Sequence, residues 1–125
     1  MMLRSMIGSF RIMPVDERFR TGVALFNQEK FFECHETIEN LWFETQDEYK
    51  DLYKGVIQVA VALHHLTRDN LSGARELFET SSRYLSKYAP EALGLNVEKL
   101  INDMKICFKS VDQKIIPKLE FYEHE

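Results

Sequence analysis

The segment from Leu52 to Arg68 constrains the fold more than any other part of this 125-residue chain. Its middle, GVIQVAVAL, is apolar on nearly every side of a helix, which is typical of a helix surrounded by other helices. Val and Ile also suit a strand, but the length of the segment and the presence of Ala60 and Ala62 favour a helix. The sequence therefore predicts a multihelical protein in which other elements cover this helix.

Helical spacing of apolar residues predicts further helices on both sides of the central one. They are expected at residues 15–29, 31–44, 71–88 and about 96–109, and Asn70 and Asn96 are expected to cap the last two. The connections are short, which favours antiparallel neighbours. The sequence thus predicts an all-α fold, a compact multihelical bundle of about five helices in mostly antiparallel hairpins. It predicts one domain over residues 1–125, with a family-like core at about 15–109.

The two ends, residues 1–13 and 110–125, are harder to assign, and Pro117 interrupts the pattern that begins at 111. Residues 1–13 and 117–125 carry apolar side chains outside the expected helices, among them Leu3, Ile12, Leu119 and Phe121. Left in solvent, these would form an unusual exposed patch. We therefore expect at least one end to pack on the domain or on a second copy in a homodimer.

Composition excludes several classes of partner. Sixteen basic and twenty acidic residues give a net charge of −4, and no basic run is present to neutralise phosphates, so no nucleic acid partner is expected. No stretch reaches the roughly 20 apolar residues of a membrane span, and the N-terminus lacks the apolar run of a secretory signal. Cys34 and Cys107 form no CxxC pair, as expected for buried, reduced thiols. The sequence predicts a soluble, cytoplasmic protein without a membrane partner.

Polar residues stand where apolar ones are expected in the helix at 31–44. At 100° per residue, His35 and Glu39 fall in the middle of its apolar face, flanked by aromatic side chains. An ionised carboxylate there is costly unless it is paired or coordinated. We expect Glu39 to contact a histidine directly, or to share a bound ion or water with it.

The central helix offers a facing partner. One of its stripes alternates polar with small side chains: Asp51, Gly55, Gln58, Ala62, His65 and Asp69. Small residues leave room for a close helix contact or for a pocket. If the two stripes face each other, they form a binding cluster of His35, Glu39, Trp42, Gln58 and His65. His64 lies about 100° from His65 and is interpreted as a partly exposed boundary residue.

Three interpretations of this cluster stay open. It is a hydrogen-bond network that fixes helix register, a ligand-binding or catalytic pocket, or a site where His35, Glu39 and His65 hold a divalent metal. His35-Glu36-x-x-Glu39 resembles the zincin helix HExxH but has Glu where the second His belongs. Two functions follow: a helical module that binds a protein or small molecule, or a hydrolase-like, metal-assisted enzyme with Glu36 as catalytic general base.

The sequence also resembles a known family over about residues 24–85. ALFNQEKFFECHETIENLW, followed by KGVIQVAVALHHLTRDNLSGA, is similar to a small helical domain of unknown function found in bacteria, archaea and plant plastid proteins. The family pattern is FFExHExxExxW followed by GxIQxAxAxxH. Matching positions are Phe31, Phe32, Glu33, His35, Glu36, Glu39, Trp42, Gly55, Gln58, Ala60, Ala62, His65, Asn70, Gly73 and Ala74. Asp69 departs from the pattern, which usually has Gly there. The resemblance implies a compact multihelical fold and no particular function.

Overall fold

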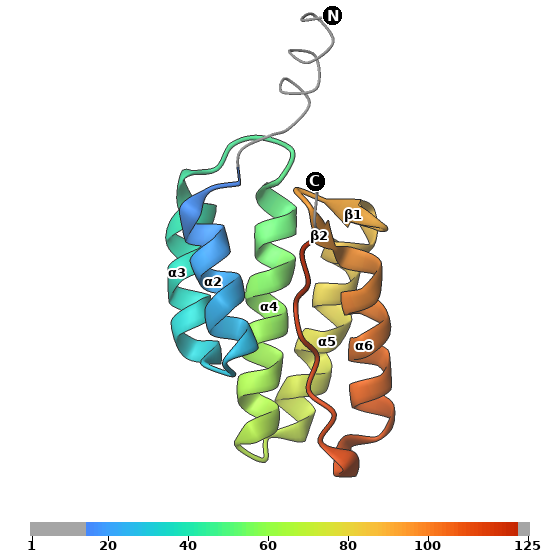
Figure 1. Cartoon of the computed structure of the whole chain (residues 1–125). Coiled ribbons are helices and arrows are strands. Elements are labelled where there is room, and N and C mark those ends of the chain that lie inside the picture. The colour runs from blue at the N-terminus through green and yellow to red at the C-terminus, as the bar shows by residue number, and fades with distance from the viewer. Residues whose placement is uncertain (1–14, 123–125) are drawn as a thin grey trace, which may run out of the picture.

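Two antiparallel helix hairpins and one further helix make up most of the protein (Figure 1). The first hairpin is α2 (Glu17–Asn27) and α3 (Phe31–Glu44), the second is α4 (Lys50–Thr67) and α5 (Leu71–Leu85), and α6 (Val97–Lys109) packs beside α5. The structure, a computed structural model, describes residues 15–122. Over these residues it confirms the predicted compact helical bundle of five α-helices.

α4 is the central helix, as its apolar sequence predicts, and it packs against α3 on one side and α5 on the other. Glycines allow the neighbouring helices to approach closely. A Cβ atom at Gly55 would lie 2.7 Å from Leu85 Cδ2 on α5, and one at Gly22 of α2 would lie 2.6 Å from Ile38 Cδ1 on α3. These distances are too short for any larger residue, so the two glycines set the spacing of their helix pairs.

Side-chain caps fix where α5 and α6 begin. Asn70 Oδ1 accepts a hydrogen bond from the Gly73 amide at 3.1 Å, and Asn96 Oδ1 accepts one from the Lys99 amide at 3.0 Å. Both asparagines are therefore the N-caps that the sequence predicts. α5 ends three residues earlier than expected, because the 3-10 turn η1 (Ser86–Tyr88) replaces its last turn.

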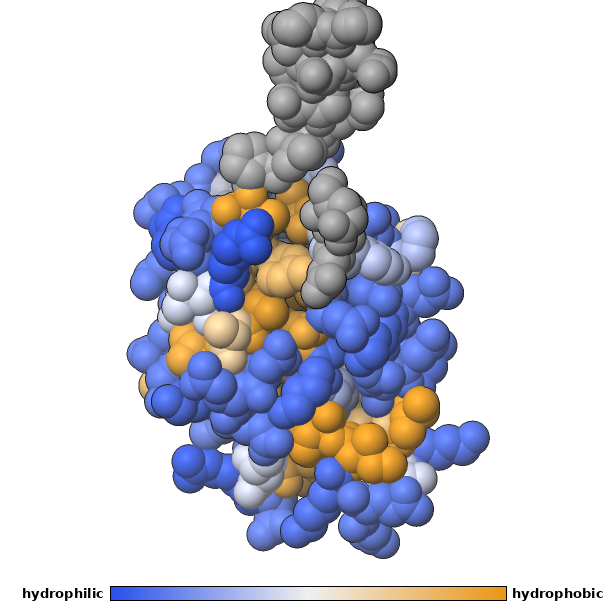
Figure 2. All heavy atoms as spheres, viewed as in Figure 1, coloured by the Kyte–Doolittle hydropathy of each residue, from blue (hydrophilic) through white to orange (hydrophobic). Residues whose placement is uncertain are grey.

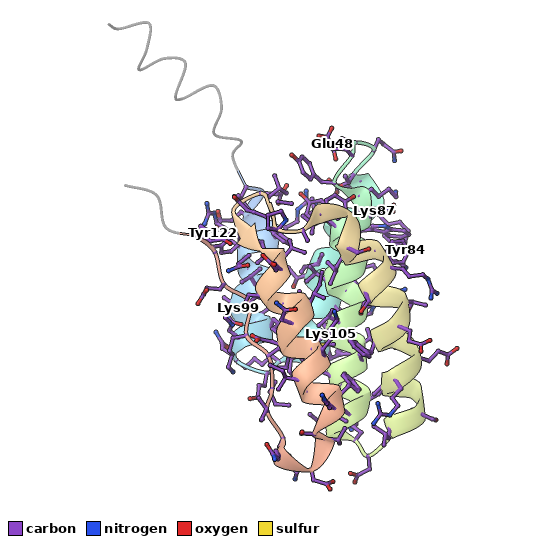
Figure 3. The ribbon with its side chains drawn as sticks, turned by 90° about the vertical axis from the view of Figure 1, so that its right-hand side faces the viewer. Glu48, Tyr84, Lys87, Lys99, Lys105 and Tyr122 are labelled. Atoms are coloured by element: carbon purple, nitrogen blue, oxygen red, sulfur yellow. The ribbon has the colours of Figure 1, made fainter. Side chains whose placement is uncertain are left out.

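The end of α5 is tied to the beginning of α4. The Tyr88 hydroxyl donates to the Glu48 carbonyl at 2.6 Å, and the Lys87 ammonium pairs with the Asp51 carboxylate. Figure 3 shows Glu48 and Lys87 at the same end of the bundle. These contacts hold the C-terminal end of α5 beside the N-terminal end of α4.

A short hairpin precedes α6. β1 (Glu91–Ala92) and β2 (Leu95–Asn96) pair antiparallel across a turn in which Leu93 and Gly94 have positive φ. The sequence predicts only a loop here, because strands of two residues are too short to produce an alternating pattern. After α6 comes the 3-10 turn η2 (Val111–Gln113).

The segment after η2 runs back along the bundle between α4 and α6 in the view of Figure 1. The Asn27 side chain accepts from the Leu119 amide at 2.7 Å and donates to the Leu119 carbonyl at 2.9 Å. Leu119 is buried, and the Phe121 ring packs edge-on against Phe19 at a centroid distance of 6.0 Å. The prediction that at least one end packs on the domain is confirmed for the C-terminal end, whereas residues 1–13 lie outside the described residues.

The face of the molecule drawn in Figure 2 is mostly hydrophilic, with hydrophobic side chains gathered in two areas. Cys34 and Cys107 are buried free thiols, as the sequence predicts. Burial raises the pKa of Cys34 to about 12, which leaves it protonated at neutral pH. Among the described helices, none combines the length and apolar character that crossing a membrane requires.

Candidate binding site between α3 and α4

His35 and Glu39 lie at the edge of the buried face of α3, which corrects the prediction that they occupy its middle. The buried residues of the helix are Phe31, Cys34, Ile38 and Leu41. Their centre is roughly 80° from His35 at 100° per residue. The prediction was wrong because it counted Phe32 as part of the core, whereas its side chain is 52% exposed. The two polar residues are therefore partly solvated.

Glu39 contacts His35 directly, which confirms the expected contact with a histidine. Glu39 Oε2 lies 3.7 Å from His35 Nε2, and the two side chains are 40% and 26% exposed. Pairs this exposed contribute about 0–1 kcal/mol. The contact therefore does not organise the core.

The polar stripe of α4 lies mainly against α5, and its member His65 also lines a pocket with α3 residues, which corrects the predicted meeting of the two whole stripes. Asp51 pairs with Lys87, and Gly55 lies against Leu85. His65 Nδ1 lies 3.1 Å from the side-chain nitrogen of Asn70, the cap of α5. Val61 and His64, the other α4 residues that line this pocket, lie about 40° and about 100° from His65 around the helix. Gly55 thus allows α4 and α5 to pack closely.

Gln58 and Trp42 take no part in a shared network with His35 and His65. Gln58 Oε1 is buried, and no hydrogen-bond donor reaches it from the residues that the structure describes. The Trp42 ring instead has the Lys50 and Lys54 ammonium groups 4.6 and 4.5 Å from its centroid. The predicted hydrogen-bond network of His35, Glu39, Gln58 and His65 is therefore not formed.

The predicted metal site is not assembled either. Within residues 15–122, no three or more His, Cys, Asp or Glu side chains are grouped so that they could hold a metal ion, and His35, Glu39 and His65 are no exception. Glu36, the predicted general base, is exposed and projects about 100° from His35. The geometry gives the hydrolase-like alternative no support.

The structure instead brings three histidines to one pocket, which we call the α3–α4 pocket. It has a volume of about 220 Å³ and is lined by Phe31, Phe32, His35, Val61, His64 and His65. The Phe32 ring centroid lies 6.0 Å from that of His35 and 6.2 Å from that of His64. Two of the predicted binding residues, His35 and His65, therefore do converge, but Glu39, Trp42 and Gln58 do not line the pocket.

His64 is the site residue that the sequence analysis missed. It is half-buried, and desolvation is the main reason why its pKa is lowered, followed by the positive charges of Arg68 and His65. A lowered pKa keeps the imidazole neutral at neutral pH. The available signal was the expected antiparallel packing of consecutive helices, since it brings the last turn of α4 beside the first turn of α3, where Phe32 lies.

A charged surface adjoins the α3–α4 pocket and shares Phe31, Phe32 and His64 with it. This second hollow measures about 600 Å³ and is also lined by Glu29, Lys30, Glu33, Thr67 and Arg68. It therefore combines two acidic and two basic side chains beside an apolar hollow.

A larger hollow of about 720 Å³ lies at the start of α2 and the end of α3. Three of its charged groups are already paired, because Arg18 lies 3.0 Å from Asp16 and 3.1 Å from Glu44, and Asp47 accepts a hydrogen bond from the Tyr49 amide at 2.9 Å. Its lining begins at Val15, at the border of the described residues. We therefore base the candidate site on the α3–α4 pocket, whose aromatic and imidazole groups are directed at the hollow itself.

Comparisons with known proteins match the part of the chain that contains this site. Residues 19–77 match the family described as Domain of unknown function (DUF309). The chain is also similar to the uncharacterized protein YpuF of Bacillus subtilis (strain 168), with 38% identity over 85 residues, which are 66% of this chain and 49% of that protein. The chain thus spans about half the length of this curated relative. All six residues that line the α3–α4 pocket fall within the matched segment.

Proposed function

We propose that this chain, which matches the DUF309 family over residues 19–77, is a helical binding module whose binding site is the α3–α4 pocket. The observation that carries the proposal is Phe32, whose side chain stays 52% exposed at the rim of an apolar hollow. A single exposed aromatic side chain is ordinary, as Phe43 at 65% exposure shows, but one at the rim of an apolar hollow enlarges the apolar surface that a partner can cover. Aromatic anchors that fill such hollows are typical of binding hot spots.

The size of the pocket indicates the class of group that it accepts. An engineered cavity of about 150 Å³ in another protein takes up benzene, so a hollow of about 220 Å³ has room for one phenyl-sized group. Phe31 and Val61 supply apolar walls, and the imidazole nitrogens of the histidines can hydrogen-bond to a polar atom on the ligand. We expect an aromatic or branched aliphatic group that carries a hydrogen-bonding atom.

Nuclear magnetic resonance with benzyl alcohol as the probe tests this proposal. We expect saturable shifts of the Val61 methyl signals and of the ring signals of His35 and His64. The variant Val61→Trp fills the hollow and abolishes these shifts, whereas Val111→Trp, on η2, leaves them unchanged. Absence of saturable shifts in the wild type, or equal shifts in Val61→Trp, would overturn the proposal.

We propose the cytoplasm as the location of this module. Its two cysteines are free and buried, which is the usual state in a reducing compartment. Fractionation of cells that express the full-length natural protein tests this, and recovery in a secreted fraction would contradict it.

A further inference from the structure

We infer that the group that fills the α3–α4 pocket is the Phe32 ring of a second copy of this chain, so that the chain forms a two-fold symmetric dimer. This inference rests on the proposed function and names the partner of that site. Phe32 lines the hollow and is also exposed beside it. Each chain therefore carries a projecting ring and a hollow of suitable size on the same surface.

A surface of this kind is complementary to itself. In a two-fold dimer the same patch of both subunits meets, and each contact is made twice. A phenyl ring fits a hollow of about 220 Å³, so two reciprocal insertions would bury both exposed Phe32 rings. No other component is needed to complete the contact.

The charges around the pocket are compatible with the association of two identical surfaces. The adjoining surface carries Glu29 and Glu33 together with Lys30 and Arg68. Glu29 already lies 3.6 Å from Lys118 of the same chain, so Glu33, Lys30 and Arg68 remain as groups of both signs that a second copy can meet. A patch of one sign would repel its own copy, whereas a patch with both signs can pair acidic with basic groups across the axis. An interface made of two Phe32 insertions and four charged side chains on each copy is small in area. We therefore expect a weak dimer whose population depends on concentration.

Analytical ultracentrifugation from micromolar to millimolar concentration tests the inference. We expect the wild-type chain to dimerise and Phe32→Ala to dimerise at least about tenfold more weakly. Val61→Trp should do the same, because it fills the hollow. Phe43→Ala is the matched control, since Phe43 lies on the same helix, is 65% exposed and does not line the pocket, and it should leave dimerisation unchanged.

Mixing the two weakened variants gives a sharper result. Phe32→Ala removes one wall of the hollow but keeps Phe31, Val61 and the three histidines, and Val61→Trp keeps the Phe32 ring, so a mixed pair restores one of the two insertions. We expect the mixture to associate more strongly than either variant alone. A monomeric wild type, unimpaired dimerisation of Phe32→Ala, or no gain on mixing would each overturn the dimer.

The same samples separate failure of the dimer from failure of the binding site. If the dimer is correct, benzyl alcohol competes with Phe32 and lowers the dimer fraction of the wild type. If the wild type is monomeric and benzyl alcohol still gives saturable shifts at Val61, the dimer is wrong and the proposed function stands. If the wild type is monomeric and the probe does not bind, both are wrong.

Discussion

Phe32 in the first turn of α3 and His64 in the last turns of α4 lie side by side at the α3–α4 pocket, with ring centroids 6.2 Å apart. They are 32 positions apart in sequence, and the antiparallel arrangement of the two helices brings them together. Neither residue belongs to the hydrophobic core. Their pairing creates the one hollow among the described residues that we interpret as a binding site.

Acidification should destabilise the chain in part through His64. Desolvation first, and then Arg68 and His65, lower its pKa below 6.5, while Glu33 opposes the shift and His35 adds to it. The unfolded chain therefore binds the proton at a higher pH than the folded chain. The stability that neutral His64 provides is complete above about pH 6.5 and is lost as the pH falls from there through the lower folded pKa.

Urea denaturation of the wild type and of His64→Asn checks this prediction. Between about pH 7.5 and about pH 5, the free energy of unfolding should fall more for the wild type than for the variant. An equal fall in both proteins would show that His64 does not contribute.

The hydrogen bonds of Asn27 should hold the C-terminal segment on the bundle. Asn27→Ala removes both bonds to the backbone of Leu119, and we expect a loss of about 1–3 kcal/mol in the free energy of unfolding. Hydrogen exchange at the Leu119 amide should also become faster. Asn40→Ala, at an exposed position of α3, is the control and should change stability by less than about 0.5 kcal/mol.

Gly22 should not tolerate a side chain while Ile38 is present. A Cβ atom there would lie 2.6 Å from Ile38 Cδ1, and such overpacking costs about 1–3 kcal/mol. Thermal and urea denaturation of Gly22→Ala, Ile38→Ala and the double variant form a double-mutant cycle. We expect the double variant to lose less than the sum of the single losses, and strict additivity would refute the close contact.

Replacing Glu39 should have little effect on stability. Its contact with His35 is 3.7 Å long and partly solvated, so Glu39→Gln should change the free energy of unfolding by less than about 1 kcal/mol. Urea denaturation measures the change. A loss above about 3 kcal/mol is typical of a broken buried pair and would mean that Glu39 is more deeply engaged than the structure shows.

The helices and their beginnings could be predicted from sequence because these features are local. The apolar run of α4 and the capping residues Asn70 and Asn96 depend on neighbouring positions in the chain. The short β1–β2 hairpin was missed because four strand residues produce no periodic pattern. The Asn27–Leu119 contact was missed because 92 positions separate its partners in the sequence.

The candidate site was predicted only in part, because its position depends on how the helices are rotated. The apolar character of Phe32 shifted the estimated centre of the buried face of α3 toward His35. On α4, sequence spacing identifies the stripe that contains Gly55 and His65 but not which neighbouring helix covers it. In the structure Gly55 packs against Leu85 of α5, whereas His65 lies both beside Asn70 and in the α3–α4 pocket. His64 contributes to this pocket in place of Gln58.

The most direct test of the binding site is a crystal structure of the wild-type chain grown with an excess of para-bromobenzyl alcohol, in which anomalous scattering locates the bromine. The wild type keeps the Phe32 ring as part of the pocket lining, and the excess probe displaces any Phe32 ring that a second copy places in the hollow. We predict bromine in the α3–α4 pocket, in contact with Phe31, Val61 and His65. A pocket without the probe, or bromine bound only elsewhere on the molecule, would contradict the account.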